Sequence, residues 1–123
     1  MIQFKSFIFV FVACWVMAGS AAFADDGAAE SLYVVHFEVG ENWNPDLPPA
    51  VQTNFQAHSA NLGRLRKEGR IQFGARYEEF GLIFIRAKDL EAIKLELDAD
   101  PGVLAGIFTY RVAKMSVFYP WQE

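Results

Sequence analysis

The hydrophobic and polar positions of this chain change their spacing several times, and each change predicts a new element. Residues 32–37 are β-branched and aromatic, which is typical of a strand. A helix is expected to begin near Pro48 and Pro49, because a first helical turn tolerates residues that lack an N–H. The helix is expected to continue to about Glu68, where Gly69 ends it.

The next stretch predicts a β-hairpin followed by a second helix. Residues 71–77 and 82–86 have the composition of strands, and the polar, Gly-containing stretch 78–81 joins them as a turn. Asp89 is the expected N-cap of a helix over residues 90–97, because its side chain can accept a hydrogen bond from a free backbone N–H.

The remaining residues complete one α+β domain over residues 31–123. The Asp-Pro step ends the second helix, one further helical turn is expected at 101–105, and a last strand at about 109–119. The order is therefore β-α-β-β-α-β. The sequence predicts a ferredoxin-like fold, a four-stranded antiparallel sheet with two helices on one face.

The strands at 32–37 and 82–86 carry apolar residues at both odd and even positions. Strands of this kind are covered on both faces of their sheet. Two helices cover only one face, so the other face needs a second sheet. The simplest source is a second copy of the chain, and the sequence predicts a homodimer.

The first 24 residues have the pattern of a secretory signal peptide. Lys5 precedes an unbroken apolar run at 7–17, and small residues end in Ala-Phe-Ala at 22–24. We expect cleavage after Ala24, a flexible acidic lead-in at 25–30, and export to the bacterial periplasm or the medium. No stable membrane association is expected after cleavage.

The alternative is that the segment stays as an anchor, since residues 7–24 are uncharged and approach the length of a spanning helix. Cys14, the only cysteine, lies inside this segment. The cleaved chain would therefore contain no disulfide and no thiolate nucleophile or ligand.

Composition narrows the classes of partner. The chain has 11 Lys+Arg against 15 Asp+Glu, a net charge of −4, and 53% apolar residues. This balance argues against a nucleic-acid partner, which needs a basic face, and against a disordered chain. The two histidines, His36 and His58, have no carboxylates at metal-ligand spacing nearby. No metal and no cofactor are predicted.

His58 is a candidate catalytic residue because of its position on the first predicted helix. Val51, Phe55, Leu62 and Leu65 form an apolar stripe along the first predicted helix, and His58 lies in the middle of it, facing the sheet. Burial favours the neutral imidazole unless a carboxylate compensates. The spacing fits a core histidine with one satisfied hydrogen bond as well as an acid/base residue, and both interpretations stay open.

Three segments together resemble the YCII-related (YciI-like) family. The first is residues 58–70 followed by Gly74, which is similar to that family's H-x3-L-x2-L helix and the turn after it. The second is residues 98–108, similar to the family's Asp-Pro stretch before the last strand. The opening strand at 32–35 is also similar, so the resemblance spans nearly the whole cleaved chain.

The resemblance implies a dimeric α/β barrel of ferredoxin-like subunits and a catalytic pair, here His58 and Asp100. A few relatives act on small cyclic or aromatic compounds, among them a dehydrochlorinase, and similar barrels include lactone isomerases and monooxygenases. Two departures stand out. Phe55 replaces an arginine that many members carry, and Ala75 replaces the proline of a common Gly-Pro.

Two hypotheses follow. In the first, His58 is a general acid/base whose imidazole Asp100 holds by a hydrogen bond, for isomerisation or elimination on a small cyclic or aromatic ligand. An apolar pocket would come from aromatic residues, with candidates Tyr33, Phe37, Phe73 and Phe84, although ordinary core packing is the expected role for at least half of them. In the second, which the two departures favour, the chain is a non-catalytic homodimer with a small-molecule-binding or structural role. Whether it is an enzyme stays open.

Overall fold

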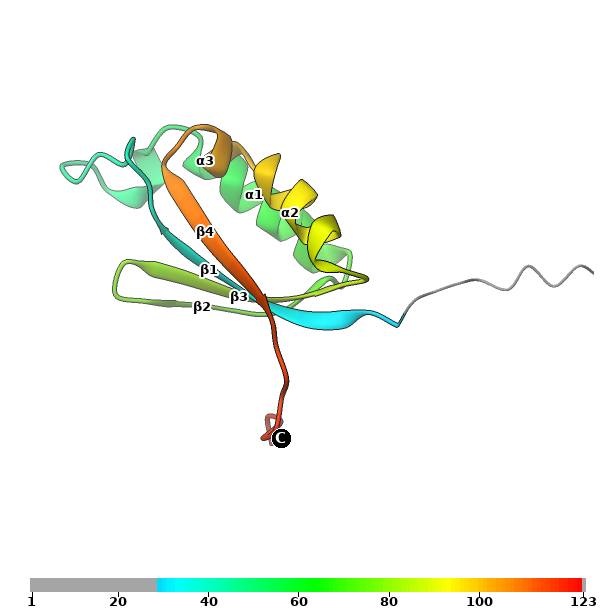
Figure 1. Ribbon diagram of the computed structural model, residues 1–123. Coiled ribbons are helices and arrows are strands. Elements are labelled where there is room, and N and C mark those ends of the chain that lie inside the picture. The colour runs from blue at the N-terminus through cyan, green and yellow to red at the C-terminus, as the bar shows by residue number, and fades with distance from the viewer. Residues whose placement is uncertain (1–28, 123) are drawn as a thin grey trace, which may run out of the picture.

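A computed structural model describes residues 29–122 of the chain as an antiparallel sheet with helices on one face (Figure 1). The sheet has four strands in the order β2-β3-β1-β4. Their bounds are Ser31–Val39 for β1, Ile71–Tyr77 for β2, Phe80–Ala87 for β3 and Phe108–Lys114 for β4. Strands next to each other in the chain are separated in the sheet, except in the β2–β3 hairpin.

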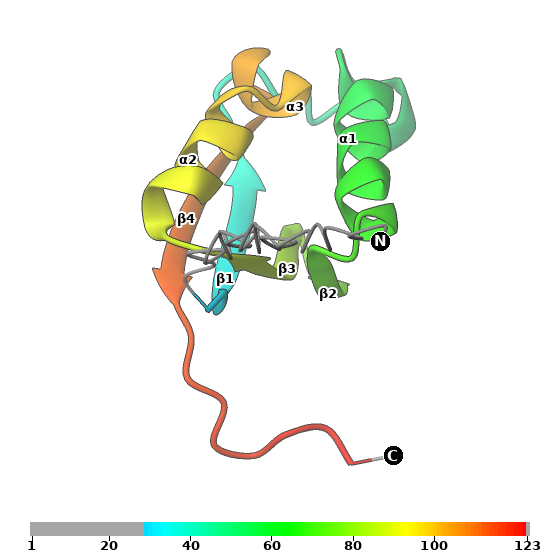
Figure 2. The same ribbon diagram turned by 90° about the vertical axis from the view of Figure 1, so that its right-hand side faces the viewer.

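The helices are α1 (Phe55–Lys67), α2 (Leu90–Asp98) and the short α3 (Pro101–Leu104). All three lie on one face of the sheet, with α1 above its β2 side and α2 above its β4 side (Figure 2). The predicted antiparallel α+β arrangement is confirmed, and α3 is the expected further turn. Pairing of two sheets into a barrel stays a prediction.

The first helix begins later than the sequence predicts. Pro49–Val51 forms a separate 3-10 turn, Asn54 has a left-handed backbone with φ of 60°, and α1 starts at Phe55. Buried Gln52 explains the difference, because its side chain bonds the loop before it: its amide donates to the carbonyls of Asn44 and Leu47.

Val51, which was expected on the buried stripe of the first helix, is therefore 59% exposed. That part of the prediction is wrong, because a loop contact between residues eight positions apart overrides the helical spacing. The rest of the stripe holds, and Leu65 is fully buried.

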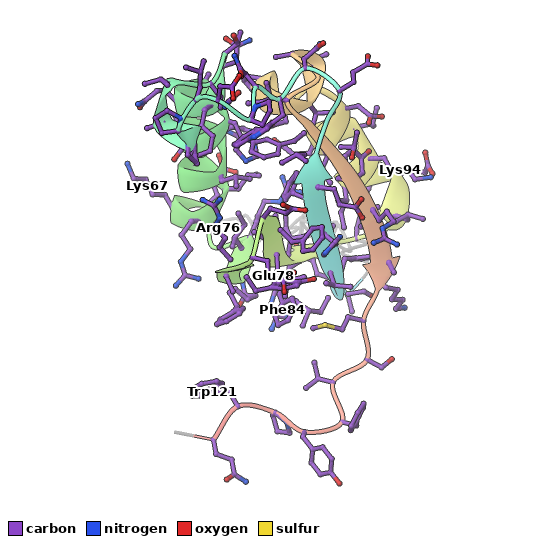
Figure 3. The ribbon with its side chains drawn as sticks, turned by 90° about the vertical axis from the view of Figure 1, so that its left-hand side faces the viewer. Lys67, Arg76, Glu78, Phe84, Lys94 and Trp121 are labelled. Atoms are coloured by element: carbon purple, nitrogen blue, oxygen red, sulfur yellow. The ribbon has the colours of Figure 1, made fainter. Side chains whose placement is uncertain are left out.

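The last strand ends at Lys114 instead of continuing to residue 119. Its partner β1 determines the end, because Tyr33 pairs with Lys114 and the N–H of Met115 donates to the carbonyl of Leu32. Beyond that point few residues of β1 remain for the last strand to pair with. The chain then leaves the sheet, and Trp121 lies well away from it (Figure 3).

The two faces of the sheet differ. On one face, three side chains of β1 are buried under the helices: Tyr33, Val35 and Phe37. They form the core together with residues of β3, α1 and α2, namely Ile83, Ile85, Leu65, Ile93 and Leu97. The alternate residues of β1 lie on the outer face, where Val34 pairs with Phe84 and His36 with Leu82. These outer side chains are only half-buried in the described chain.

The segment expected to be a signal peptide, residues 1–24, and most of the lead-in lie outside the described residues. Among residues 29–122, none of the helices has the length and apolar character to cross a membrane.

Candidate active site

His58 lies at the end of the first turn of α1 and points toward the sheet, as the helical spacing predicts. It is only 6% exposed. Aromatic rings surround the imidazole: the Phe108 ring centroid is 4.6 Å away, and the Phe37 ring meets it edge-on at 5.3 Å. The histidine is therefore held in an apolar setting in which any charge on it needs a specific partner.

Asp100 supplies that partner. Its Oδ1 lies 2.7 Å from Nδ1 of His58, although the two residues are 42 positions apart. The same oxygen accepts from the N–H of Gly102 at 2.9 Å, because Asp100 is the N-cap of α3 and Pro101 occupies the first helical position. The cap holds the carboxylate in place, and its side chain is fully buried.

Asn61 holds the second oxygen of the carboxylate. Its side-chain amide donates to Oδ2 of Asp100 at 2.8 Å, while its own oxygen accepts from Arg64 at 2.9 Å. The arginine thereby sets the orientation of the amide, since only the NH2 end is left to face the carboxylate. Asn61 was not singled out from the sequence; its spacing of three residues from His58, on the same helix face, was the available signal.

These contacts control the charge on Asp100. Burial by itself raises the pKa of this carboxyl group, but the hydrogen bonds from His58 and Asn61 outweigh burial and bring the pKa below its ordinary value. Asp100 is therefore a carboxylate, which can only accept hydrogen bonds. It follows that Nδ1 of His58 donates, and in the neutral imidazole Nε2 is then the nitrogen that can accept a proton.

A cavity of about 290 Å³ lies beside His58, between α1 and the β2–β3 hairpin. Its walls are mostly apolar and come from Phe37, Trp43, Phe55, Leu62, Ile83 and Phe108. The polar residues that line it are His58, Ser59, Arg76 and Glu79. Nε2 of His58 has no hydrogen-bond partner among the described residues, and it is not fully buried, so it is the nitrogen left for contact with a bound molecule.

Of the aromatic residues expected around a ligand, the structure places only Phe37 in this cavity. Tyr33 lies in the core, and Phe73 and Phe84 pack against each other, with ring centroids 5.3 Å apart, on the outer face of the sheet. Phe73 and Phe84 were wrong as pocket candidates, because side chains alternate between faces along a strand and the pairing register turns these two outward. Tyr33 shares the covered face with Phe37 but is buried in the core, which is the ordinary role expected for some of these aromatics.

His36 is far from this site, on the outer face of the sheet. Its Nε2 lies 2.8 Å from the hydroxyl of Tyr77, and its Nδ1 lies 3.3 Å from Glu38. No cluster of three or more potential metal-ligating side chains occurs within residues 29–122. The two histidines therefore do not share a site.

These features define a ferredoxin-like α+β domain with a buried His–Asp pair beside a small apolar cavity. A solved structure with the same fold is 5-chloro-2-hydroxyhydroquinone dehydrochlorinase (TftG) from Burkholderia phenoliruptrix AC1100, in complex with 2,5-dihydroxybenzoquinone. The two chains are 20% identical, with a TM-score of 0.53 over 69% of this chain and 93% of the other. This likeness shows a shared fold. No protein-family model matches the chain. No curated protein matches it either.

Proposed function

We propose that this protein is an enzyme that moves a proton on a small cyclic or aromatic compound, with His58 as general acid/base and Asp100 as the residue that orients it. One observation carries the proposal: a buried imidazole, bound to a carboxylate through Nδ1, lines an apolar cavity and keeps its second nitrogen free of hydrogen bonds to the described residues. This is the arrangement that general acid/base catalysis requires.

The geometry supports a two-step proton transfer. Nε2 of His58 takes a proton from a carbon or hydroxyl of the bound compound, and the bond electrons stay on the substrate. Asp100 stabilises the imidazolium that forms, since its carboxylate already accepts from Nδ1. In an isomerisation the proton returns to a different atom; in an elimination the electrons expel a leaving group as an anion. Both reactions balance without an oxidant or reductant.

The size and lining of the cavity support a single-ring substrate. A volume of about 290 Å³ is near the lower end of ligand pockets, about 300–1,000 Å³ for drug-sized molecules. The similar dehydrochlorinase, whose complex contains 2,5-dihydroxybenzoquinone, offers hydroxylated quinones and phenols as the first compounds to screen.

The decisive experiment compares His58→Gln with His36→Gln in a turnover screen of ring compounds. We expect a compound whose conversion falls by about 10²–10⁴-fold in His58→Gln, while His36→Gln, on the far face of the sheet, leaves the rate unchanged. Ligands that raise the melting midpoint of both variants, with no turnover by the unmodified protein, would instead support the non-catalytic binding alternative.

We propose further that the outer face of the sheet pairs with a second copy of the chain. Phe73 on this face is 45% exposed and packs against half-buried Phe84, which in turn pairs with half-buried Val34. Analytical ultracentrifugation of the unmodified protein should show a dimer, and Phe73→Glu a monomer. Leu95→Glu, on the exposed side of α2, is the matched control and should stay dimeric.

Export is proposed from residues 1–24 alone. Expression of the full sequence in a bacterium, followed by fractionation and mass determination, should give a periplasmic or secreted product that begins at Asp25. A full-length product in the membrane fraction would support the anchor.

A further inference from the structure

Arg76 lines the same cavity as His58. It lies on β2 and pairs with Gly81 of β3, so its side chain shares the helix-covered face of the sheet with Phe37, the β1 partner of Gly81. Because Gly81 has no side chain, nothing from β3 covers Arg76 at this pair. The Arg76 side chain projects on the α1 side of the sheet (Figure 3). One wall of the cavity therefore ends in a permanent positive charge.

The other arginines near the helices already have protein partners. Arg64 and Arg70 both form ion pairs with Glu96, and Arg66 donates to the backbone carbonyls of Ile71 and Gln72. Within residues 29–122, Arg76 has neither an ion pair nor a side-chain hydrogen bond. Its guanidinium group is thus available to a molecule in the cavity.

The rest of the cavity lining makes the positive charge of Arg76 favour an anionic ligand. Most of the cavity wall is apolar, so an anion that enters loses hydration and needs a cation in return. A guanidinium group meets this need best, because its planar donors match the two oxygens of a carboxylate or the adjacent oxygens of a hydroxyquinone anion. The same cation would also stabilise negative charge that develops when His58 removes a proton.

We propose that Arg76 binds an oxyanion on the substrate ring, so that the substrate class is a small anionic ring compound, a carboxylate or an acidic enol or phenol. This inference rests on the proposed function and names the ligand of the same site. Glu79, in the hairpin turn, lines the same cavity and is the carboxylate that opposes an incoming anion. Removing the charge of Arg76 should therefore weaken the binding of an anion, and removing the charge of Glu79 should strengthen it.

The test measures binding, which does not require that the true substrate be known. The probes are 4-hydroxybenzoate, its neutral isostere 4-hydroxybenzamide, and 2,5-dihydroxybenzoquinone, titrated calorimetrically into the unmodified protein. We expect the carboxylate to bind about tenfold more tightly than the amide. Arg76→Gln should remove this preference, Arg76→Lys should keep part of it, and Glu79→Gln should increase it. Arg86→Gln removes a positive charge on the opposite face of the sheet; it is the matched control and should leave the preference for the benzoate unchanged.

Two outcomes would overturn the inference, and they are distinguishable. Equal affinity for the benzoate and the benzamide, or a preference that survives Arg76→Gln, removes the role of Arg76 while leaving acid/base chemistry at His58 intact. If none of the three probes binds and no ring compound is turned over in a His58-dependent way, the proposed function fails and the substrate class fails with it.

Discussion

Gly102 lies directly against the imidazole of His58. A Cβ added at Gly102 would be 3.0 Å from Cβ and 3.1 Å from Cγ of His58, and 3.0 Å from the ring of Phe108. The missing side chain lets α3 approach the histidine, and this approach also brings the Asp100 cap within hydrogen-bond distance of Nδ1. The glycine after Asp-Pro is thus part of how the pair is built.

Replacing Gly102 should therefore displace the pair. We expect Gly102→Val to destabilise the fold by about 1–3 kcal/mol through overpacking and to lower His58-dependent turnover more than stability alone explains. Gly63→Ala is the matched control: nothing lies within 4 Å of the added Cβ. In the middle of α1 that change should stabilise by about 0.5–1 kcal/mol. Urea unfolding of both variants measures the two changes in stability. A Gly102→Val protein as stable as the unmodified protein would contradict the packing argument.

The charge on Asp100 should make stability depend on acid pH. Its pKa is lowered in the folded protein, so its contribution is present above the unfolded pKa of about 3.9 and is lost as pH falls through the folded value. Asp100→Asn should flatten the unfolding free energy in that acid range and lower it by about 1–3 kcal/mol at neutral pH. Urea unfolding from pH 7 down to pH 3 measures both effects.

Asp46→Asn, a change in an exposed loop, is the control for that acid series. It should leave the acid slope as it is in the unmodified protein. An acid slope that Asp100→Asn leaves unchanged would show that Asp100 is not the ionised partner of His58.

Asn61 should act as a positioning residue through Asp100. Asn61→Ala removes the donor to Oδ2, which raises the pKa of Asp100 and weakens its hold on His58. We expect kcat to fall about tenfold, with the acid limb of its pH profile displaced to lower pH, because a weaker carboxylate contact stabilises the imidazolium form of His58 less. Asn61→Asp should be worse than Asn61→Ala, because it sets a second carboxylate against the first. Equal kcat profiles for all three proteins would contradict the positioning role.

Tyr110 offers a test at alkaline pH. Burial and a 2.6 Å hydrogen bond to Asp98 raise the pKa of Tyr110 to about 12. A raised folded pKa means that its contribution to stability is complete below the unfolded pKa of about 10 and is lost as pH rises through the folded value. Absorbance at 295 nm, as the difference between unmodified protein and Tyr110→Phe, should show this late titration. Asp98→Asn should move it to lower pH.

Local patterns sufficed where an element depends on its own residues. The β2–β3 hairpin and α2 follow the predicted bounds closely, and Asp89 caps α2 by accepting from the N–H of Ala92 at 2.8 Å. Strand alternation and helix capping are set by neighbouring backbone groups, so one sequence shows them directly. The position of His58 on the covered face of α1 followed from the same periodicity.

The sequence by itself therefore determined the order of the elements, the sheet-facing position of His58 and, by family resemblance, the choice of Asp100 as its partner. Only the tertiary structure decided that Asn61 holds that carboxylate, that Arg76 lines the cavity, and that Phe73 and Phe84 face away from it. The physical reason is that helical and strand periods act over a few residues, whereas a site depends on sheet register and helix packing. Those join side chains as far apart in the chain as His58 and Asp100, and local spacing carries no record of them.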